Sequence, residues 1–180
     1  MLSHQERTDL SQSHVILSCE GGAEKAIAKI LLDGGVTIFS DPDNDVQITG
    51  VRSAKRIEEE YLSIDYEKNV AVVRFLDSRN ENFKLGRLYR DNTTVVSLTT
   101  HPEIEILIIL AEGRYQEYWQ RYRHSMKASE YCSGVLGYGN VKSQEFVYNF
   151  FSDIDRLTGA LQEHRSLRPE AENCIADILR

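Results

Sequence analysis

The chain has 180 residues, of which 41% are hydrophobic and 27% charged, and its formal net charge is −7 at pH 7. This length fits one domain with an appendage, and the hydrophobic content is sufficient for a buried core. The acidic balance argues against a general nucleic-acid coat protein, because such proteins bind phosphates through Lys and Arg. It does not exclude a nuclease whose acidic site holds a metal ion.

The elements are predicted from the spacing of apolar residues, taken in chain order. Residues 1–13 are polar and predict a flexible N-terminus. The expected strands are residues 14–19, 36–39, 70–76 and 94–98, and the expected helices are residues 23–33, 51–63, 102–123, 143–151, 153–163 and 169–180. Strands that alternate with helices predict an α/β fold with a mainly parallel sheet of about four strands and helices on both faces. The expected boundaries are 14–123 for the α/β domain and 124–180 for a helical C-terminal extension that packs on the same domain.

The cellular compartment is predicted from the cysteines and the apolar runs. The chain has three cysteines without regular spacing, which argues against a disulfide framework and favours a reducing cytoplasm. The polar N-terminus lacks the apolar region of a signal peptide, and the longest apolar run, residues 104–111, is too short to cross a bilayer. We therefore expect a cytoplasmic protein that does not associate with membranes.

Acidic residues follow three of the expected strands. Glu20 and Glu24 come after the first strand, Asp77 follows residues 70–76, and Glu105 lies shortly after residues 94–98. Ligands of open α/β sheets bind beyond the carboxyl ends of the strands, so these carboxylates are expected to converge. Converging carboxylates repel one another unless a cation lies between them, and their oxygens suit Mg²⁺ or Mn²⁺. The pattern predicts a metal site for phosphoryl transfer or nucleic-acid cleavage.

The same acidic residues also fit helix capping. Glu24 lies in the first turn of an expected helix, where the macrodipole favours negative charge. Thr100 and Glu103 fit a capping box, with Pro102 at the first helical position. The residues alone leave the metal-site and capping interpretations open.

Three motifs, in this order along the chain, resemble the TOPRIM-like proteins and, within them, the RloB-like type. The segment Glu20-Gly21-Gly22-Ala23-Glu24 is similar to the family's Glu-Gly-x-Thr-Glu, with Ala in place of Thr. Asp77 matches the first Asp of the family's Asp-x-Asp, whereas Arg79 occupies the second position. The segment His101-Pro102-Glu103-Ile104-Glu105 resembles the Asn-Pro-x-Phe-Glu stretch that opens a hydrophobic helix in the RloB-like type.

This resemblance implies an acidic site that binds Mg²⁺ or Mn²⁺ and, in many members, nucleic-acid cleavage or strand chemistry, in a defence or mobile-element system. It implies that Glu20 is the general acid/base, that Asp77 and Glu105 bind the metal, and that Glu24 binds the metal or supports its ligands. Arg79 removes one ligand and adds a fixed positive charge, which either stabilises a phosphate or replaces the metal. The alternative function is a non-catalytic interaction subunit with a degenerate site, which binds a protein partner through its C-terminal helices.

Aromatic and basic residues alternate between residues 114 and 127. Stacking rings and basic side chains together suit single-stranded nucleic acid. The rings of Tyr115, Tyr118, Trp119 and Tyr122 are also spaced as one face of a helix, which favours packing. The candidate substrate-binding residues are His101, Arg121, Arg123 and Lys127.

Overall fold

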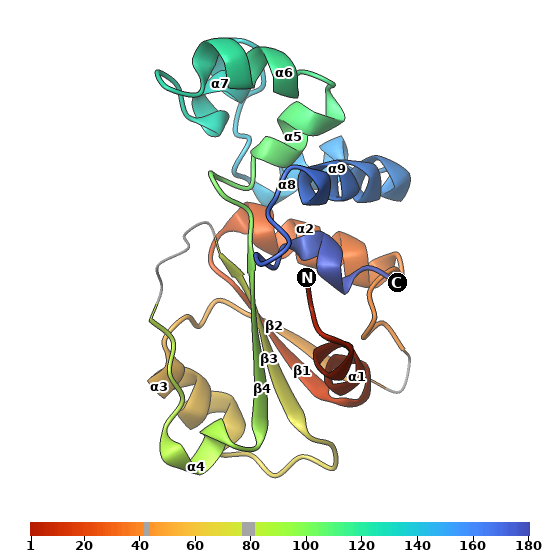
Figure 1. The fold of residues 1–180 in the computed structure, drawn as a ribbon, viewed down its shortest axis with the longest axis vertical. Coiled ribbons are helices and arrows are strands. Elements are labelled where there is room, and N and C mark those ends of the chain that lie inside the picture. Colours follow the sequence, from red (N-terminus) through yellow and green to blue (C-terminus); the bar gives the residue numbers. More distant parts are fainter. Residues whose placement is uncertain (42–43, 77–81) are drawn as a thin grey trace.

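The computed structural model describes residues 1–41, 44–76 and 82–180. Its centre is an all-parallel sheet of four strands in the order β2-β1-β3-β4, with helices on both sides (Figure 1). The strands are β1 (His14–Cys19), β2 (Val46–Thr49), β3 (Val70–Leu76) and β4 (Thr93–Thr99). The predicted α/β fold with a mainly parallel sheet and a helical C-terminal region is therefore confirmed.

Helices account for most of the remaining chain. They are α1 (His4–Gln12), α2 (Gly22–Asp33), α3 (Ala54–Ile57), η1 (Glu58–Leu62), α4 (Arg87–Arg90), α5 (Ile106–Ala111), α6 (Tyr115–Glu117), η2 (Tyr118–Tyr122), α7 (Ala128–Gly134), α8 (Gln144–Phe150), α9 (Ile154–Ser166) and η3 (Ile175–Ile178). No helix in the described part of the chain is long and apolar enough to cross a membrane.

The two faces of the sheet belong to two hydrophobic clusters, because successive strand residues point to opposite sides. Val15 and Leu17 of β1 lie in the larger cluster, which includes α2 and the C-terminal helices. Ile16 of β1 and Val72 of β3 lie in the smaller cluster, beneath α3 and η1. Both faces of the central strands are thus buried, which explains why these strands read as continuous apolar runs.

One edge of the sheet differs from the sequence prediction. Residues 36–39, predicted as a strand, contribute only an isolated bridge between Thr37 and Leu179. The strand beside β1 is instead β2, whose pattern Val-Gln-Ile-Thr is short and only partly buried. A strand of this kind lacks the apolar run by which β1 and β3 were predicted.

The apolar segment after β4 is buried as predicted, but it is not one long helix. Residues 106–110 are all buried in α5, and the segment predicted as a helix over residues 102–123 is divided into α5, α6 and η2. Gly113 separates α5 from α6 with a φ of 66°, a left-handed conformation that glycine adopts without steric cost. The peptide bond between His101 and Pro102 is cis, and α5 begins at Ile106, not at Pro102.

Both ends of the chain differ from the prediction. Residues 4–12, within the segment predicted to be flexible, form α1, because Ser3 and Glu6 make a capping box and Leu10 is fully buried. The predicted helix over residues 169–180 is reduced to the 3₁₀ turn η3, in which Ile175 and Ile178 are buried against the domain. The apolar face of this segment is therefore covered by its own chain.

Candidate functional site

The carboxyl ends of the strands bring two described segments to the same edge of the sheet. Cys19 pairs with Phe75, and Leu76 pairs with Thr99, so β1 and β4 end on either side of β3. The chain leaves β1 at Glu20 and β4 at Thr100. The two predicted site residues that follow β3, Asp77 and Arg79, lie outside the described residues.

Among the predicted acidic residues that the structure describes, Glu20 is the most accessible. Its carboxylate forms an ion pair with Arg52, which follows β2. The side chains of Glu20 and Arg52 are 43% and 45% exposed to solvent. The pair therefore joins the loops after two neighbouring strands while both charges remain accessible to a ligand.

Arg74 is a third charged group near this edge, and the sequence analysis missed it. It lies in β3 with only 1% of its surface exposed, and its guanidinium lies over the Phe83 ring, 4.1 Å from the centroid. Burial lowers the pKa of Arg74, and the nearby charge of Arg52 lowers it further. The charges of Arg52 and Arg74 are therefore close enough at this edge to interact. The sequence feature that could have identified Arg74 is its position as the single charged residue in the apolar run of residues 70–76.

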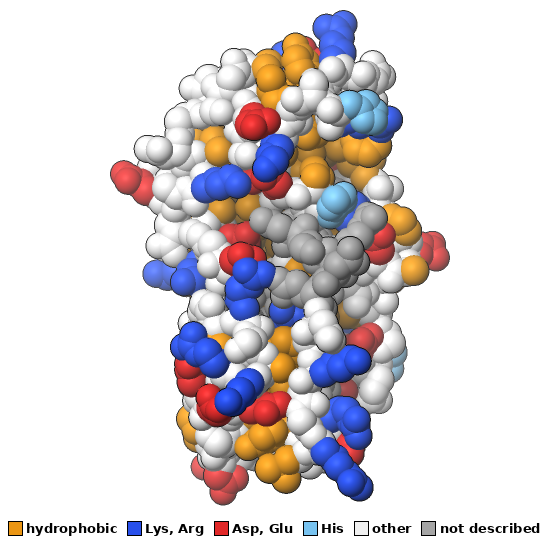
Figure 2. All heavy atoms as spheres, turned by 90° about the vertical axis from the view of Figure 1, so that its left-hand side faces the viewer, with side chains coloured by type: hydrophobic (Ala, Val, Ile, Leu, Met, Phe, Trp, Pro, Cys, Tyr) orange, Lys and Arg blue, Asp and Glu red, His pale blue; other side chains and the backbone are white. Residues whose placement is uncertain are grey.

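The face that carries α3 and α4 displays Lys and Arg side chains interspersed with acidic ones (Figure 2). The two signs of charge are therefore mixed on this face, in a chain whose net charge is −7.

Glu24 serves the backbone of α2. It is 5% exposed, and its Oε2 accepts a hydrogen bond from the Gly21 N–H at 3.1 Å. A Cβ atom on Gly21 would lie 2.6 Å from that oxygen, so a larger residue at this position would displace the end of the Glu24 side chain. For Glu24 the structure shows the capping interaction that the sequence left open.

Glu105 is buried near α7. It is 2% exposed, and its carbonyl oxygen accepts a hydrogen bond from the Cys132 thiol, with the sulfur 3.8 Å away. Burial raises the pKa of Cys132 to about 12, and the negative charge of Glu105 contributes to this increase. These contacts place Glu105 in the interior beside Cys132.

Glu103 caps a different helix from the one predicted. Its Oε2 accepts hydrogen bonds from the N–H and the hydroxyl of Ser129, at 3.0 and 2.9 Å, in the first turn of α7. Burial alone would raise the pKa of Glu103, but the bonds from Ser129 and the charge of Lys142 outweigh it and lower the pKa. Thr100, the predicted partner of Glu103, instead donates its N–H to the Leu76 carbonyl at 3.0 Å. The predicted capping box is therefore wrong.

The described carboxylates do not form a metal site by themselves. Within residues 1–41, 44–76 and 82–180, no three His, Cys, Asp or Glu side chains are close enough to hold a metal ion. Glu24 and Glu105 are buried, and Glu24 caps α2. The predicted Mg²⁺ or Mn²⁺ site therefore depends on Asp77, outside the described residues.

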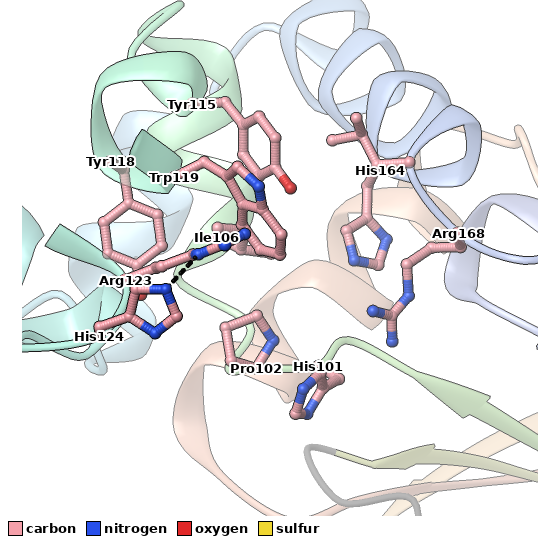
Figure 3. A pocket seen from close by; sticks show the side chains of 11 residues that line it. His101, Pro102, Ile106, Tyr115, Tyr118, Trp119, Arg123, His124, His164 and Arg168 are labelled. Atoms are coloured by element: carbon pink, nitrogen blue, oxygen red, sulfur yellow. Dashed lines mark hydrogen bonds between the residues drawn. The ribbon is translucent and has the colours of Figure 1, made fainter. Parts of the chain in front are cut away.

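A pocket of about 410 Å³ lies next to the end of β4, between two walls (Figure 3). Tyr115, Trp119 and Arg123 form one wall, and His164 and Arg168 form the other, with Pro102 between them. The other described lining residues are His101, Ile106, Tyr118, His124 and Leu167. None of these lining residues is acidic, so the pocket combines apolar surface with positive charge.

The predicted substrate-binding residues divide between two cavities. His101 and Arg123 line this pocket, and Lys127 lines a neighbouring cavity of about 520 Å³ that also contains Arg123. Arg121 is exposed and lines neither cavity. The sequence analysis missed His164 and Arg168, since they come from a distant segment that reaches this site only in the fold.

Comparison of the chain with family models, with curated proteins and with solved structures gives no match.

Proposed function

We propose that this chain acts on a phosphodiester or phosphoryl group at the carboxyl edge of the sheet, with Glu20 as the general acid/base. The observation that supports this proposal is the accessible Glu20 carboxylate beside Arg52, with Arg74 near Arg52. A carboxylate at this position would accept and return protons, and the exposed Arg52 guanidinium would bind phosphate oxygens. Nucleic acid is the proposed substrate.

A divalent ion belongs to this proposal through Asp77. Glu20 and Asp77 would be its ligands, and the ion would supply charge neutralisation at the phosphate. The buried Glu105 and the capping Glu24 are poorer candidates than they were from sequence. Arg79 would add a further positive charge.

The experiment is a cleavage assay on labelled single- and double-stranded DNA and RNA with Mg²⁺ or Mn²⁺. Glu20→Gln is nearly isosteric but cannot accept a proton, so it should reduce the rate by about 10²–10⁴-fold while leaving the melting temperature unchanged. Glu59→Gln is the matched control, because Glu59 is exposed and its carboxylate pairs with Lys55, four residues earlier. Equal rates for both variants would show that Glu20 is not the acid/base.

The second candidate is a non-catalytic interaction subunit. The burial of Glu24 and Glu105 favours it, since neither carboxylate is available as an open ligand. It predicts no cleavage by the wild type under any metal condition and no divalent-metal binding in calorimetry. Either turnover or metal binding that is lost in Glu20→Gln would exclude it.

A further inference from the structure

The pocket beside the end of β4 contains a buried histidine whose ring nitrogens lack a well-formed hydrogen bond. His164 is 2% exposed, and neither ring nitrogen makes a hydrogen bond of acceptable geometry to any described residue. The backbone of His101 is near enough to favour the protonated ring, but burial and the charge of Arg168 lower the pKa of His164 to about 4. The ring is therefore neutral at pH 7 and offers one donor and one acceptor.

His164 faces the pocket from α9 (Figure 3). Buried polar groups in folded proteins are nearly always hydrogen-bonded, so a buried imidazole at a cavity wall without a well-formed hydrogen bond indicates a position for a ligand.

The opposite wall is built for a planar group. Tyr115 and Trp119 are stacked with ring centroids 5.6 Å apart and an interplanar angle of 21°. The Arg123 guanidinium lies over the Trp119 ring, 4.0 Å from its centroid. Trp119 is 44% exposed, so its ring is accessible to a ligand. Rings and a guanidinium plane in one row are surfaces on which nucleobases stack.

The charge of the pocket fits an anion. Arg123 donates its Nε–H to His124 Nε2 at 2.9 Å, which fixes the guanidinium at the pocket wall. Arg168 contributes a second guanidinium and is paired with Glu172, 3.2 Å away. The charges of both arginines reach Tyr115, where they oppose the increase in its pKa that burial causes. The volume of about 410 Å³ lies within the range of small-molecule sites, about 300–1,000 Å³.

We propose that this pocket binds a nucleotide, with the base against Tyr115, Trp119 and Arg123, the phosphate toward Arg123 and Arg168, and a polar edge of the ligand bonded to His164. This inference goes beyond the proposed function, because it requires neither Glu20 nor a metal ion.

Trp119 is the only tryptophan of the chain, so its fluorescence reports directly on the pocket. The full chain is titrated in EDTA with a nucleoside monophosphate, the corresponding nucleoside, ribose 5-phosphate and inorganic phosphate. We expect saturable quenching by the monophosphate and at least tenfold weaker binding of the other three. If inorganic phosphate binds as tightly as the monophosphate, the pocket binds a simple anion and the nucleotide proposal is overturned. If the nucleoside binds as tightly, the phosphate group does not contribute to binding and its proposed contacts with Arg123 and Arg168 are overturned.

Two arginines of the same segment, Arg121 and Arg123, test whether the nucleotide binds in this pocket. Arg123→Gln should weaken binding of the monophosphate by about tenfold or more, the scale of one lost charge-assisted hydrogen bond. Arg121→Gln removes an equal charge from the same segment outside the pocket, and should change binding less than twofold. Calorimetry is used for the variants, because Arg123 itself contacts the reporter ring. Equal losses would show general attraction of anions and would overturn the pocket assignment.

The wild-type His164 ring supplies a readout that needs no substitution in the interior. Nuclear magnetic resonance of ¹⁵N-labelled histidine should show the His164 nitrogens shifting in proportion to nucleotide occupancy. Unchanged His164 signals at saturation would overturn its role. Glu20→Gln should bind the nucleotide like the wild type, so failure of the catalytic proposal and failure of this one are distinguished.

Discussion

The Arg165 guanidinium and the buried carboxylate of Asp177 form an ion pair in which Nη1 lies 3.2 Å from Oδ2. The same guanidinium donates to the carbonyl oxygens of Glu172, at 2.6 Å, and Pro169, at 2.7 Å. The backbone N–H of Cys174 also donates to the Asp177 carboxylate, at 2.9 Å. One arginine of α9 therefore holds the C-terminal segment against the domain.

Substitution of Arg165 should lower the stability of the folded protein. Arg165→Met leaves the Asp177 carboxylate buried without its cation, so the free energy of unfolding should fall by about 3–5 kcal/mol in urea titrations. The matched control is Arg56→Met, which breaks an exposed pair with Glu60 on one helix and should cost about 0.3–0.5 kcal/mol. Equal effects would mean that the C-terminal segment is not packed on α9.

The buried helix α5 offers a second test of stability. Leu107 is fully buried, so Leu107→Ala should reduce the free energy of unfolding by about 2–5 kcal/mol through lost burial and a residual cavity. Leu88→Ala, at a leucine that is 76% exposed, makes the same chemical change and should shift stability by less than about 0.5 kcal/mol. The difference between the two denaturation midpoints measures the packing of α5.

A substitution at Gly21 tests the capping of α2, with Gly159 in α9 as the control. Gly21→Ala places a methyl group on the Glu24 carboxylate and should cost about 0.5–2 kcal/mol, the range for loss of a helix cap. Gly159→Ala lies within α9, where nothing is within 4 Å of the new methyl group, and should stabilise by about 0.5–1 kcal/mol. Thermal melts should therefore move in opposite directions. A gain in stability for Gly21→Ala would show that the cap is dispensable.

His164 should make stability depend on pH. Its pKa is lowered by burial to about 4 in the folded protein, against 6.5 for an ordinary histidine, so the unfolded chain binds the proton more tightly. This stabilisation is present above about pH 6.5 and is lost as the pH falls toward 4, with a total of about 3 kcal/mol.

The measurement compares the wild type with His164→Gln across this pH range. Gln cannot titrate, so the difference between the two unfolding free energies isolates His164. The other buried histidine, His14, has a pKa lowered by burial and is present in both proteins, so its contribution cancels. A difference that does not change with pH would contradict the burial of an uncharged His164.

The fold was predictable from sequence where apolar patterns were long. Strand β3 coincides with the predicted residues 70–76, and β1 with residues 14–19, because both faces of these strands are buried. Strand β2 was missed, since its partly buried residues give no apolar run. The helix over residues 102–123 was wrongly predicted as continuous. The spacing of apolar side chains carries no information on the left-handed backbone conformation of Gly113, where the helix is interrupted.

The candidate site was less predictable than the fold. Glu20 lies at the expected strand end, and Arg123 lies in the pocket wall. Glu24 was predicted as a metal ligand but caps α2. A glutamate can have either role, and the sequence alone does not distinguish them. His164 joins His101 only because α9 packs on α5, a contact between segments far apart in the chain.

Strand β4 ends the sheet, and its outer side is contacted near both ends by distant parts of the chain. The Thr99 N–H donates to the Asn173 carbonyl at 3.0 Å, and the Thr94 hydroxyl donates to Asp9 Oδ2 at 3.2 Å. Unpaired groups on an edge strand are a template on which other molecules add strands and aggregate. The segment around Asn173 and helix α1 therefore protect the native protein from edge-to-edge aggregation, and detachment of either would expose a surface for self-assembly.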